Sequence, residues 1–199
     1  MTDQPSTLRA RRRAETQRLI QAHAVRLFTE RGYDATAVTD VAGAAGVSPM
    51  TVYRHFPTKE DLVLADQHAR LVAERIAASP AEQPLVRRIG RALVDAATEL
   101  TGDGDELTAG GRFLLARLRL MITTPALRAK HLDNQYALQQ AIVTALGDGN
   151  DTFRTQAATG ACLAALHTAL VRWAEGDGRT PLPGLIAEAF AAAFGDQGP

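Results

Sequence analysis

A short segment in the first third of this 199-residue chain concentrates side chains that can bind phosphate oxygens or the edges of nucleic-acid bases. Its members are Thr39, Ser48, Pro49, Met50, Thr51, Tyr53, Arg54, His55 and Lys59. Hydroxyl, imidazole and ammonium groups donate to phosphate oxygens, and such contacts fix the register of a protein on a duplex. An arginine can bind a guanine edge through two hydrogen bonds. The set predicts a surface that binds double-stranded DNA.

The residues around this set indicate the elements that position it. Thr39 suits the N-cap of a first short helix, and Gly46 supplies the left-handed conformation that ends that helix. Ser48 suits the N-cap of a second helix, with Pro49 in its first turn, where no amide hydrogen is missed. The spacing therefore predicts a helix-turn-helix over about residues 37–56 with its second helix exposed.

This region resembles the DNA-binding region of the tetracycline-repressor (TetR) family. The family signature is matched at Ala45, Gly46, Val47, Ser48, Thr51, Tyr53, His55, Phe56 and Lys59. Upstream, the family's first helix and its exit are matched at Ile20, Ala24, Phe28, Arg31, Gly32, Tyr33 and Thr36. The resemblance covers roughly residues 12–65 and implies a dimeric transcriptional regulator that binds operator DNA. A helical hairpin that binds no DNA is the alternative.

The resemblance also divides the roles within the set. In the family pattern, the positions that vary and face the bases correspond to Pro49, Met50 and Arg54. Arg54 suits a guanine edge, a contact worth about 1–3 kcal/mol of discrimination. Pro49 and Met50 have no side-chain donors, so apolar contact with thymine methyl groups is expected there. Phosphate contacts are expected from the other polar residues, although Tyr53 could instead be a packing aromatic.

The charge of the chain is divided unevenly. Its formal net charge is zero, but residues 1–59 hold nine Lys or Arg and five Asp or Glu. This asymmetry suits a DNA-binding head on a neutral-to-acidic body. The run Arg11-Arg12-Arg13 is either an arm that contacts phosphate or the minor groove, or a solvated charge run.

Composition disfavours several other classes. The single cysteine, Cys162, excludes an internal disulfide, and with no membrane span or secretory signal in the sequence we expect a cytoplasmic protein. The turn at 101–106 has Asp103 and Asp105 but lacks the further ligands of a calcium loop. No metal and no cofactor are predicted. Cys162 and His167 lie five residues apart on one predicted helix, and no motif of a metalloprotease, a serine hydrolase or a phosphate-binding loop occurs, so an enzyme is disfavoured.

Helical periodicity extends along the whole chain, so the predicted fold class is all-α, with about nine helices. We predict a DNA-binding domain over 9–65 and a ligand-binding and dimerisation domain over 66–199. The predicted helices cover 8–31, 59–78, 86–100, 113–121, 127–146, 153–173 and 185–194, in addition to the helix-turn-helix pair. The helix over 59–78 is the expected bridge between the two domains.

Polar residues interrupt the apolar stripes of the predicted body helices. His131 and Asn134 fall on the stripe of the 127–146 helix, His167 falls on that of the 153–173 helix, and Arg117 lies between two leucines. Such groups, when buried, need partners, so they are locally bonded, exposed, or in a pocket. We predict that these four residues bind a ligand.

Two further expectations concern the body. Its sequence around 117–120, 124–128 and Trp173 resembles regulators with an acyl-CoA-type C-terminal domain, related to the mycofactocin regulator, which implies a small hydrophobic effector such as an acyl-CoA. Ala157, Gly160, Ala161 and Ala164 form a stripe of small residues that would let two helices approach closely in a homodimer, or would pack inside one subunit.

The predicted function is that of a homodimeric repressor released from its operator by a small apolar effector. An activator of the same architecture is an alternative, and so is a dimeric DNA-binding protein that has no effector.

Overall fold

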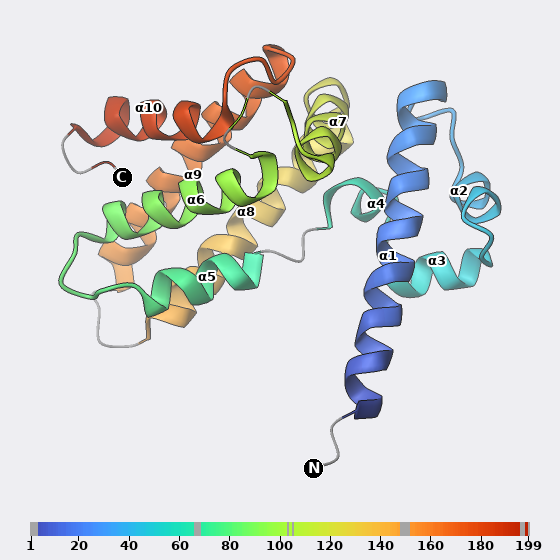
Figure 1. Ribbon diagram of the computed structural model, residues 1–199, viewed down its shortest axis with the longest axis horizontal. Coiled ribbons are helices and arrows are strands. Elements are labelled where there is room, and N and C mark those ends of the chain that lie inside the picture. The colour runs from blue at the N-terminus through green and yellow to red at the C-terminus, as the bar shows by residue number, and fades with distance from the viewer. Residues whose placement is uncertain are drawn as a thin grey trace.

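The computed structural model describes residues 4–65, 69–102, 104, 106–147, 152–195 and 198, and within these ranges its regular structure is entirely helical, as predicted. Figure 1 shows two groups of helices, which we call the head and the body. The head holds α1 (Gln4–Arg31), α2 (Val38–Ala44), α3 (Pro49–His55) and α4 (Asp61–Leu64). The body holds α5 (Ala69–Ala78), α6 (Leu85–Thr101), α7 (Ala109–Thr123), α8 (Pro125–Leu146), α9 (Thr152–Glu175) and α10 (Leu182–Phe194).

The head is built around one face of α1. Ile20, Ala24 and Phe28 lie on that face and are at most 1% exposed. Val52 and Phe56, from α3 and its C-cap, are buried in the same apolar core. Packing these five side chains together fixes the orientation of α3, because it turns the face that carries Val52 toward the core.

Two glycines end helices of the head as predicted. Gly32 follows α1 with φ +92°, and Gly46 lies in the turn between α2 and α3 with φ +67°. Both values fall in the left-handed region, which favours glycine. The amide of Val47, next in the turn, donates to the carbonyl of Ala42 at 3.0 Å, so the chain reverses tightly before α3 begins.

The helix caps agree with the sequence at Ser48 but not at Thr39. The hydroxyl of Ser48 accepts from the amide of Thr51 at 3.1 Å, which confirms the predicted N-cap of α3. The predicted cap at Thr39 is wrong, since Ala37 is the N-cap of α2 and Thr39 lies inside the helix. The side-chain hydrogen bond at the start of α2 comes from Asp40 rather than Thr39. The carboxylate of Asp40 accepts from the amide of Ala37 at 2.8 Å.

Two predicted helix boundaries are also wrong. Helix α1 begins at Gln4, earlier than residue 8. The predicted bridge helix over 59–78 is not continuous, because the backbone leaves the helical conformation at Ala65 (ψ 121°) and the next helix is α5. The split raises the number of helices in the described ranges to ten.

The body buries its largest side chains between α6, α7, α8, α9 and α10, among them Trp173, Phe190, Ile89, Met121, Leu127 and Ile142. Helices α8 and α10 both pack against α9, and α5 packs against α8. Asp103 and Asp105, the residues of the rejected calcium loop, lie outside the described residues. Within the described part of the chain, no group of three or more His, Cys, Asp or Glu could hold a metal ion. None of the described helices is both long and apolar enough to span a bilayer.

Head and body meet at α4. This helix contacts α1 on the head side and α7 and α8 on the body side, and α1 itself contacts α7. In Figure 1, α4 lies between the blue α1 and the body. The last carbonyls of a helix have no donors within the helix, so those of α4 are available to side chains from elsewhere in the chain.

Candidate nucleic-acid interface and body cavity

The outer face of α3 is exposed and is not packed against the rest of the chain. Met50 is 75% exposed and Tyr53 is 50% exposed, and Pro49 and Arg54 are exposed beside them. On the opposite face, Val52 is fully buried. Exposed large apolar side chains next to a guanidinium are typical of an interaction surface, since they gain no packing energy within the subunit.

Two hydroxyls at the start of α3 are bonded to each other. Ser48 Oγ and Thr51 Oγ1 are 2.9 Å apart, in addition to the cap bond. Ser48 is therefore a positioning residue for α3 whether or not it also contacts DNA. Thr39 is exposed on α2, where its hydroxyl faces solvent rather than a helix end.

His55 lies half-buried at the end of α3, and among the described residues its Nδ1 atom has no hydrogen-bond partner. Burial lowers its pKa, and the positive charges of Arg13 and Arg54 lower it further. The effect of Arg13 places the arginine-rich part of α1 near the C-terminal end of α3. The basic run 11–13 is exposed.

Lys59, predicted to contact phosphate, makes contacts within the head. Its ammonium donates to the carbonyl of Tyr33 at 2.6 Å and lies 4.4 Å from the centre of the Tyr33 ring and 5.5 Å from that of Phe28. The hydroxyl of Tyr33 in turn donates to Glu60 at 2.9 Å. In this geometry the charge of Lys59 is directed into the head and joins the end of α1 to the start of α4.

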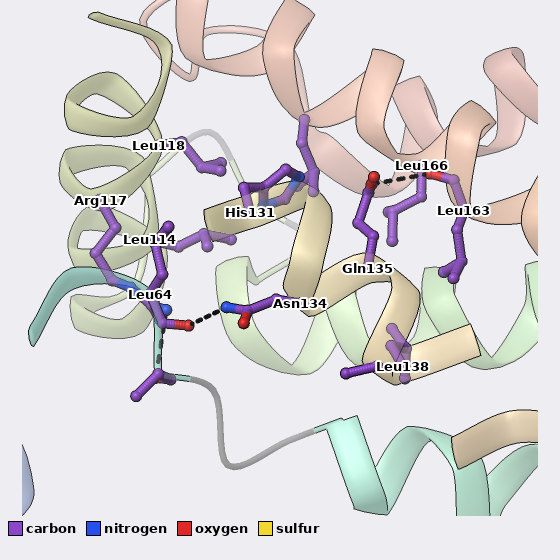
Figure 2. Close-up of a pocket in the computed structure, with 13 residues that line it drawn as sticks. Leu64, Leu114, Arg117, Leu118, His131, Asn134, Gln135, Leu138, Leu163 and Leu166 are labelled. Carbon is purple, nitrogen blue, oxygen red and sulfur yellow. Dashed lines mark hydrogen bonds between the residues drawn. The ribbon is translucent and has the colours of Figure 1, made fainter. Parts of the chain in front are cut away.

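A cavity of about 310 Å³ lies in the body next to the end of α4. Arg117, His131 and Asn134, three of the four residues predicted to bind a ligand, line it. The fourth, His167, is hydrogen-bonded to His131 at 3.0 Å but is not itself part of the lining. Figure 2 shows Arg117 and Asn134 extending from α7 and α8 toward the chain at Leu64.

The polar residues of the cavity also hold the head. Arg117 Nε donates to the carbonyl of Val63, and its guanidinium lies 3.5 Å from the carbonyl of Ala65. The amide nitrogen of Asn134 donates to the carbonyl of Leu64 at 3.1 Å, the dashed line between the two residues in Figure 2. Consecutive carbonyls at the end of α4 are thus bonded to the body. These bonds give a physical reason for the break in the predicted bridge helix at Ala65.

His131 is neutral near pH 7. Burial lowers the pKa of His131 to about 4, and the nearby charges of His167 and Arg117 act in the same direction. Its Nε2 atom shares a hydrogen bond with Nδ1 of His167, and the tautomers of the two rings decide which of them donates.

One polar residue of the cavity was not predicted from the sequence. Gln135 lines it and donates from Nε2 to the carbonyl of Leu163 at 3.3 Å. A signal existed, because residue 135 is four positions after His131 and therefore shares its helical face.

A second cavity, of about 330 Å³, lies deeper in the body. Helices α5, α6 and α10 contribute to its mostly apolar lining. Leu114, Leu166 and Leu170 line both cavities.

The predicted stripe of small residues on α9 is divided by the structure. Ala157, Ala161 and Ala164 are exposed and available to a second copy of the chain. Gly160 instead faces α8, since a Cβ atom there would lie 3.1 Å from Nε2 of Gln139. Gly160 is therefore a packing position within one subunit.

Two known protein families match two separate regions of the chain. The family described as "Bacterial regulatory proteins, tetR family" matches residues 20–65, and the family described as "MftR C-terminal domain" matches residues 111–194. The transcriptional repressor AcnR of Corynebacterium glutamicum is 31% identical over 150 residues, which cover 73% of this chain and 70% of AcnR. The chain belongs to the tetR family of bacterial regulatory proteins.

Other relatives are matched over part of their length. The transcriptional regulator TcmR of Streptomyces glaucescens is 32% identical over 66% of this chain, and the match spans 62% of TcmR. The match to the regulator CymR of Pseudomonas putida is 46% identical but spans 28% of that protein.

Solved structures show the same fold across nearly the whole chain. NalD of Pseudomonas aeruginosa, the secondary repressor of the MexAB-OprM efflux pump, superposes with a TM-score of 0.58 at 20% identity, covering 91% of this chain and 94% of NalD. FadR of Bacillus subtilis, solved in complex with stearoyl-CoA, superposes with a TM-score of 0.53 at 19% identity, covering 89% and 97%. These likenesses establish the helical head-and-body architecture.

Proposed function

We propose that this protein is a homodimeric transcriptional repressor that binds operator DNA through α3 and is released by a small apolar effector. Residues 9–65 would form the DNA-binding domain and residues 66–199 the ligand-binding and dimerisation domain. The observation that carries the proposal is the outer face of α3, where Pro49, Met50, Tyr53 and Arg54 are exposed within a family of DNA-binding regulators. Arg54 would bind a base edge, and Thr39, Thr51, Tyr53 and His55 would contact phosphates.

Dimerisation follows from how little DNA a single helix can read. One recognition helix contacts only a few base pairs, so useful specificity needs two of them about 34 Å apart on one face of the duplex. The exposed alanines of α9, beside the packed α10, offer a close helix–helix contact across a two-fold axis. We assign the dimer interface to these two helices.

The effector site is assigned to the cavity between α4, α7, α8 and α9. Its volume suits a small molecule, and its lining combines leucines with a few polar groups. The structure of FadR with stearoyl-CoA supports an acyl-CoA as one candidate of this class. Because the cavity touches α4, a bound ligand can alter how the head is held.

We assign no enzymatic activity to the chain and place it in the cytoplasm, where a bacterial regulator meets its operator. Cys162, the one thiol, is fully buried, and burial raises its pKa to about 12, so it would be unreactive. Arg117 and Asn134 are bonded to the end of α4, and His131 and His167 are bonded to each other.

Gel-shift titration tests the proposal, with the purified chain and the intergenic DNA that flanks its gene. We expect a salt-sensitive complex of one dimer per site that is lost on adding an acyl-CoA or another apolar ligand from a panel. A complex that forms but persists with every ligand would favour the DNA-binding protein without an effector. Increased transcription from the bound site in a reporter assay would favour the activator.

A further inference from the structure

The N-terminal half of α1 continues beyond the core of the head. From residue 8 onward, Ile20 is the first buried residue, and Arg9 lies about 16 Å from it along the helix axis. Residues 8–13 are all exposed, and in Figure 1 the blue end of α1 continues past α3 toward the N-terminus. We call residues 8–19 the α1 extension. Packing within the subunit contributes little to its stability, and a helix of this length is marginal in water on its own.

The α1 extension is strongly basic. It holds five arginines and one acid, Glu15. Among the described residues, no ion pair involves any of these five arginines. The first turn of α1 holds no acid, so the cations near this end oppose the helix dipole, and like charges one turn apart repel each other. Both effects destabilise the helix in isolation, and an anionic partner would remove both.

Two of the arginines share the face of α1 that packs in the head. Arg13 precedes Ile20 by seven residues and Ala24 by eleven, and Arg9 precedes Ile20 by eleven. These intervals are close to two and three full helical turns, so Arg9 and Arg13 continue the core face of α1 beyond the core. Burial lowers the pKa of His55, at the end of α3, and the positive charge of Arg13 lowers it further, which agrees with a position of Arg13 on the side of α3.

The opposite face of the α1 extension carries a partly balanced charge. Arg11 lies two positions before Arg13, or about 200° around the helix, and Arg18 shares the face of Arg11 because it follows by seven. Glu15 is four residues after Arg11 and three before Arg18, spacings at which side chains are neighbours on a helix. The one acid of the extension therefore offsets charge on this face, while the face of Arg9 and Arg13 keeps its full positive charge.

Building on the proposed function, we infer that the α1 extension is a second DNA-binding element, in which Arg9 and Arg13 bind phosphates beside the bases that α3 contacts. The two residues are about 6 Å apart along the helix axis, and a duplex carries about one negative charge per 1.7 Å of its own axis, so each can bind a separate phosphate. Such contacts add affinity and fix the register on the duplex but carry no sequence information.

The salt dependence of DNA binding by the full-length protein tests the inference. Arg9→Gln combined with Arg13→Gln removes about four phosphate contacts per dimer. The slope of log affinity against log salt concentration should fall by roughly three to four units, both on the intergenic DNA that flanks the gene and on a random duplex of the same length. Wild type should therefore lose about 100-fold more affinity than this double variant between about 50 and 200 mM salt. Fluorescence anisotropy measures both slopes.

Two further double variants separate phosphate binding from general charge and from structure. Arg11→Gln combined with Arg18→Gln removes the same charge from the opposite face and should change the slope by less than about one unit. Arg9→Lys combined with Arg13→Lys keeps the charge and should preserve the wild-type slope. Glutamine and lysine are good helix formers, so circular dichroism should show the same helix content in all of these proteins.

Failure of the inference is distinguishable from failure of the proposed function. If the Arg9 and Arg13 double variant has the wild-type slope, the α1 extension is a solvated surface and the inference is wrong, while DNA binding through α3 stands. Equal reductions by the two glutamine double variants would show a general attraction of the basic helix and would overturn the assignment to one face. If wild-type protein binds neither duplex, the proposed function and the inference both fall.

Discussion

The outer face of α3 and the lining of the body cavity use polar residues in opposite ways. On α3 the polar and large apolar side chains point into solvent, and the fold gains nothing from them. In the cavity, Arg117, Asn134 and His131 point inward and are bonded to the protein itself. A long, rigid partner such as a duplex must be met by exposed groups, whereas a small ligand is enclosed and has to displace existing contacts.

This difference implies different sensitivities to mutation. Changes on the outer face of α3 should alter binding without altering stability, while changes in the cavity should alter both. The short helix α4 is the place where the two regions meet, since its core side chains belong to the head and its carbonyls are bonded to the body.

The largest effect is expected inside the head. Phe56→Ala removes a ring that is 2% exposed and should lower the free energy of unfolding by roughly 3–5 kcal/mol, with loss of DNA binding. Chemical denaturation followed by circular dichroism measures this change. Met50→Ala, at a residue 75% exposed, is the control and should change stability by less than about 0.5 kcal/mol. Equal destabilisation by both variants would contradict the assignment of the two faces of α3.

Arg54→Ala should weaken binding to the true operator by about 1–3 kcal/mol and relax the preference at one base position. The stability of the protein should not change, because the side chain is exposed. Fluorescence anisotropy with the operator and with random duplex DNA measures both affinities. A loss of the same size on random DNA would show that Arg54 contacts phosphate rather than a base.

The stability of the body should depend on pH through His131. Its pKa is lowered from 6.5 to about 4 in the folded protein, so below about pH 6.5 the unfolded chain takes up a proton that the folded chain does not. The free energy of unfolding should therefore fall by about 1–3 kcal/mol between pH 7 and pH 4, and this contribution should level off below pH 4. Denaturation at several pH values measures it, and His131→Gln should flatten the profile.

A matched substitution at His23 in the head controls for general effects of acid. If His131→Gln and wild type showed the same dependence on pH, the pKa of His131 would not be lowered in the folded protein.

The smallest effect concerns Lys59. Since its ammonium is bonded to Tyr33, Lys59→Met should lower stability by about 1 kcal/mol and leave the salt dependence of DNA binding unchanged. The slope of log affinity against log salt concentration provides the measurement. A slope reduced by about one unit would show that Lys59 turns outward and binds a phosphate in the complex.

Local signals in the sequence were enough to predict most of the head. Gly46 acts through its own backbone conformation, and Ser48 acts through a hydrogen bond to a residue three positions away. Both roles could therefore be predicted from the adjacent sequence. The cap of α2 was assigned to the wrong residue because Thr39 and Asp40 are both good capping types. Only the geometry shows that the carboxylate reaches back to Ala37.

The inward-facing residues of the body could be predicted from the sequence, but the break in the bridge helix could not. Helical periodicity placed Arg117, His131 and Asn134 on inward faces, and all three line the cavity. The break at Ala65 was not predictable, since no Gly or Pro occurs between 59 and 78 and the donors that stabilise it, from Gln21 and Arg117, lie at least 44 residues away along the chain. Tertiary hydrogen bonds here override a local preference for helix.

The most direct test of the central claim is selection of duplexes from a random DNA library by the full-length protein, followed by footprinting of the enriched sequence. We predict a two-fold symmetric site whose half-sites are one helical turn apart, and loss of its enrichment with Arg54→Ala. Enrichment of no sequence, or of a single asymmetric site protected by a monomer, would contradict the account.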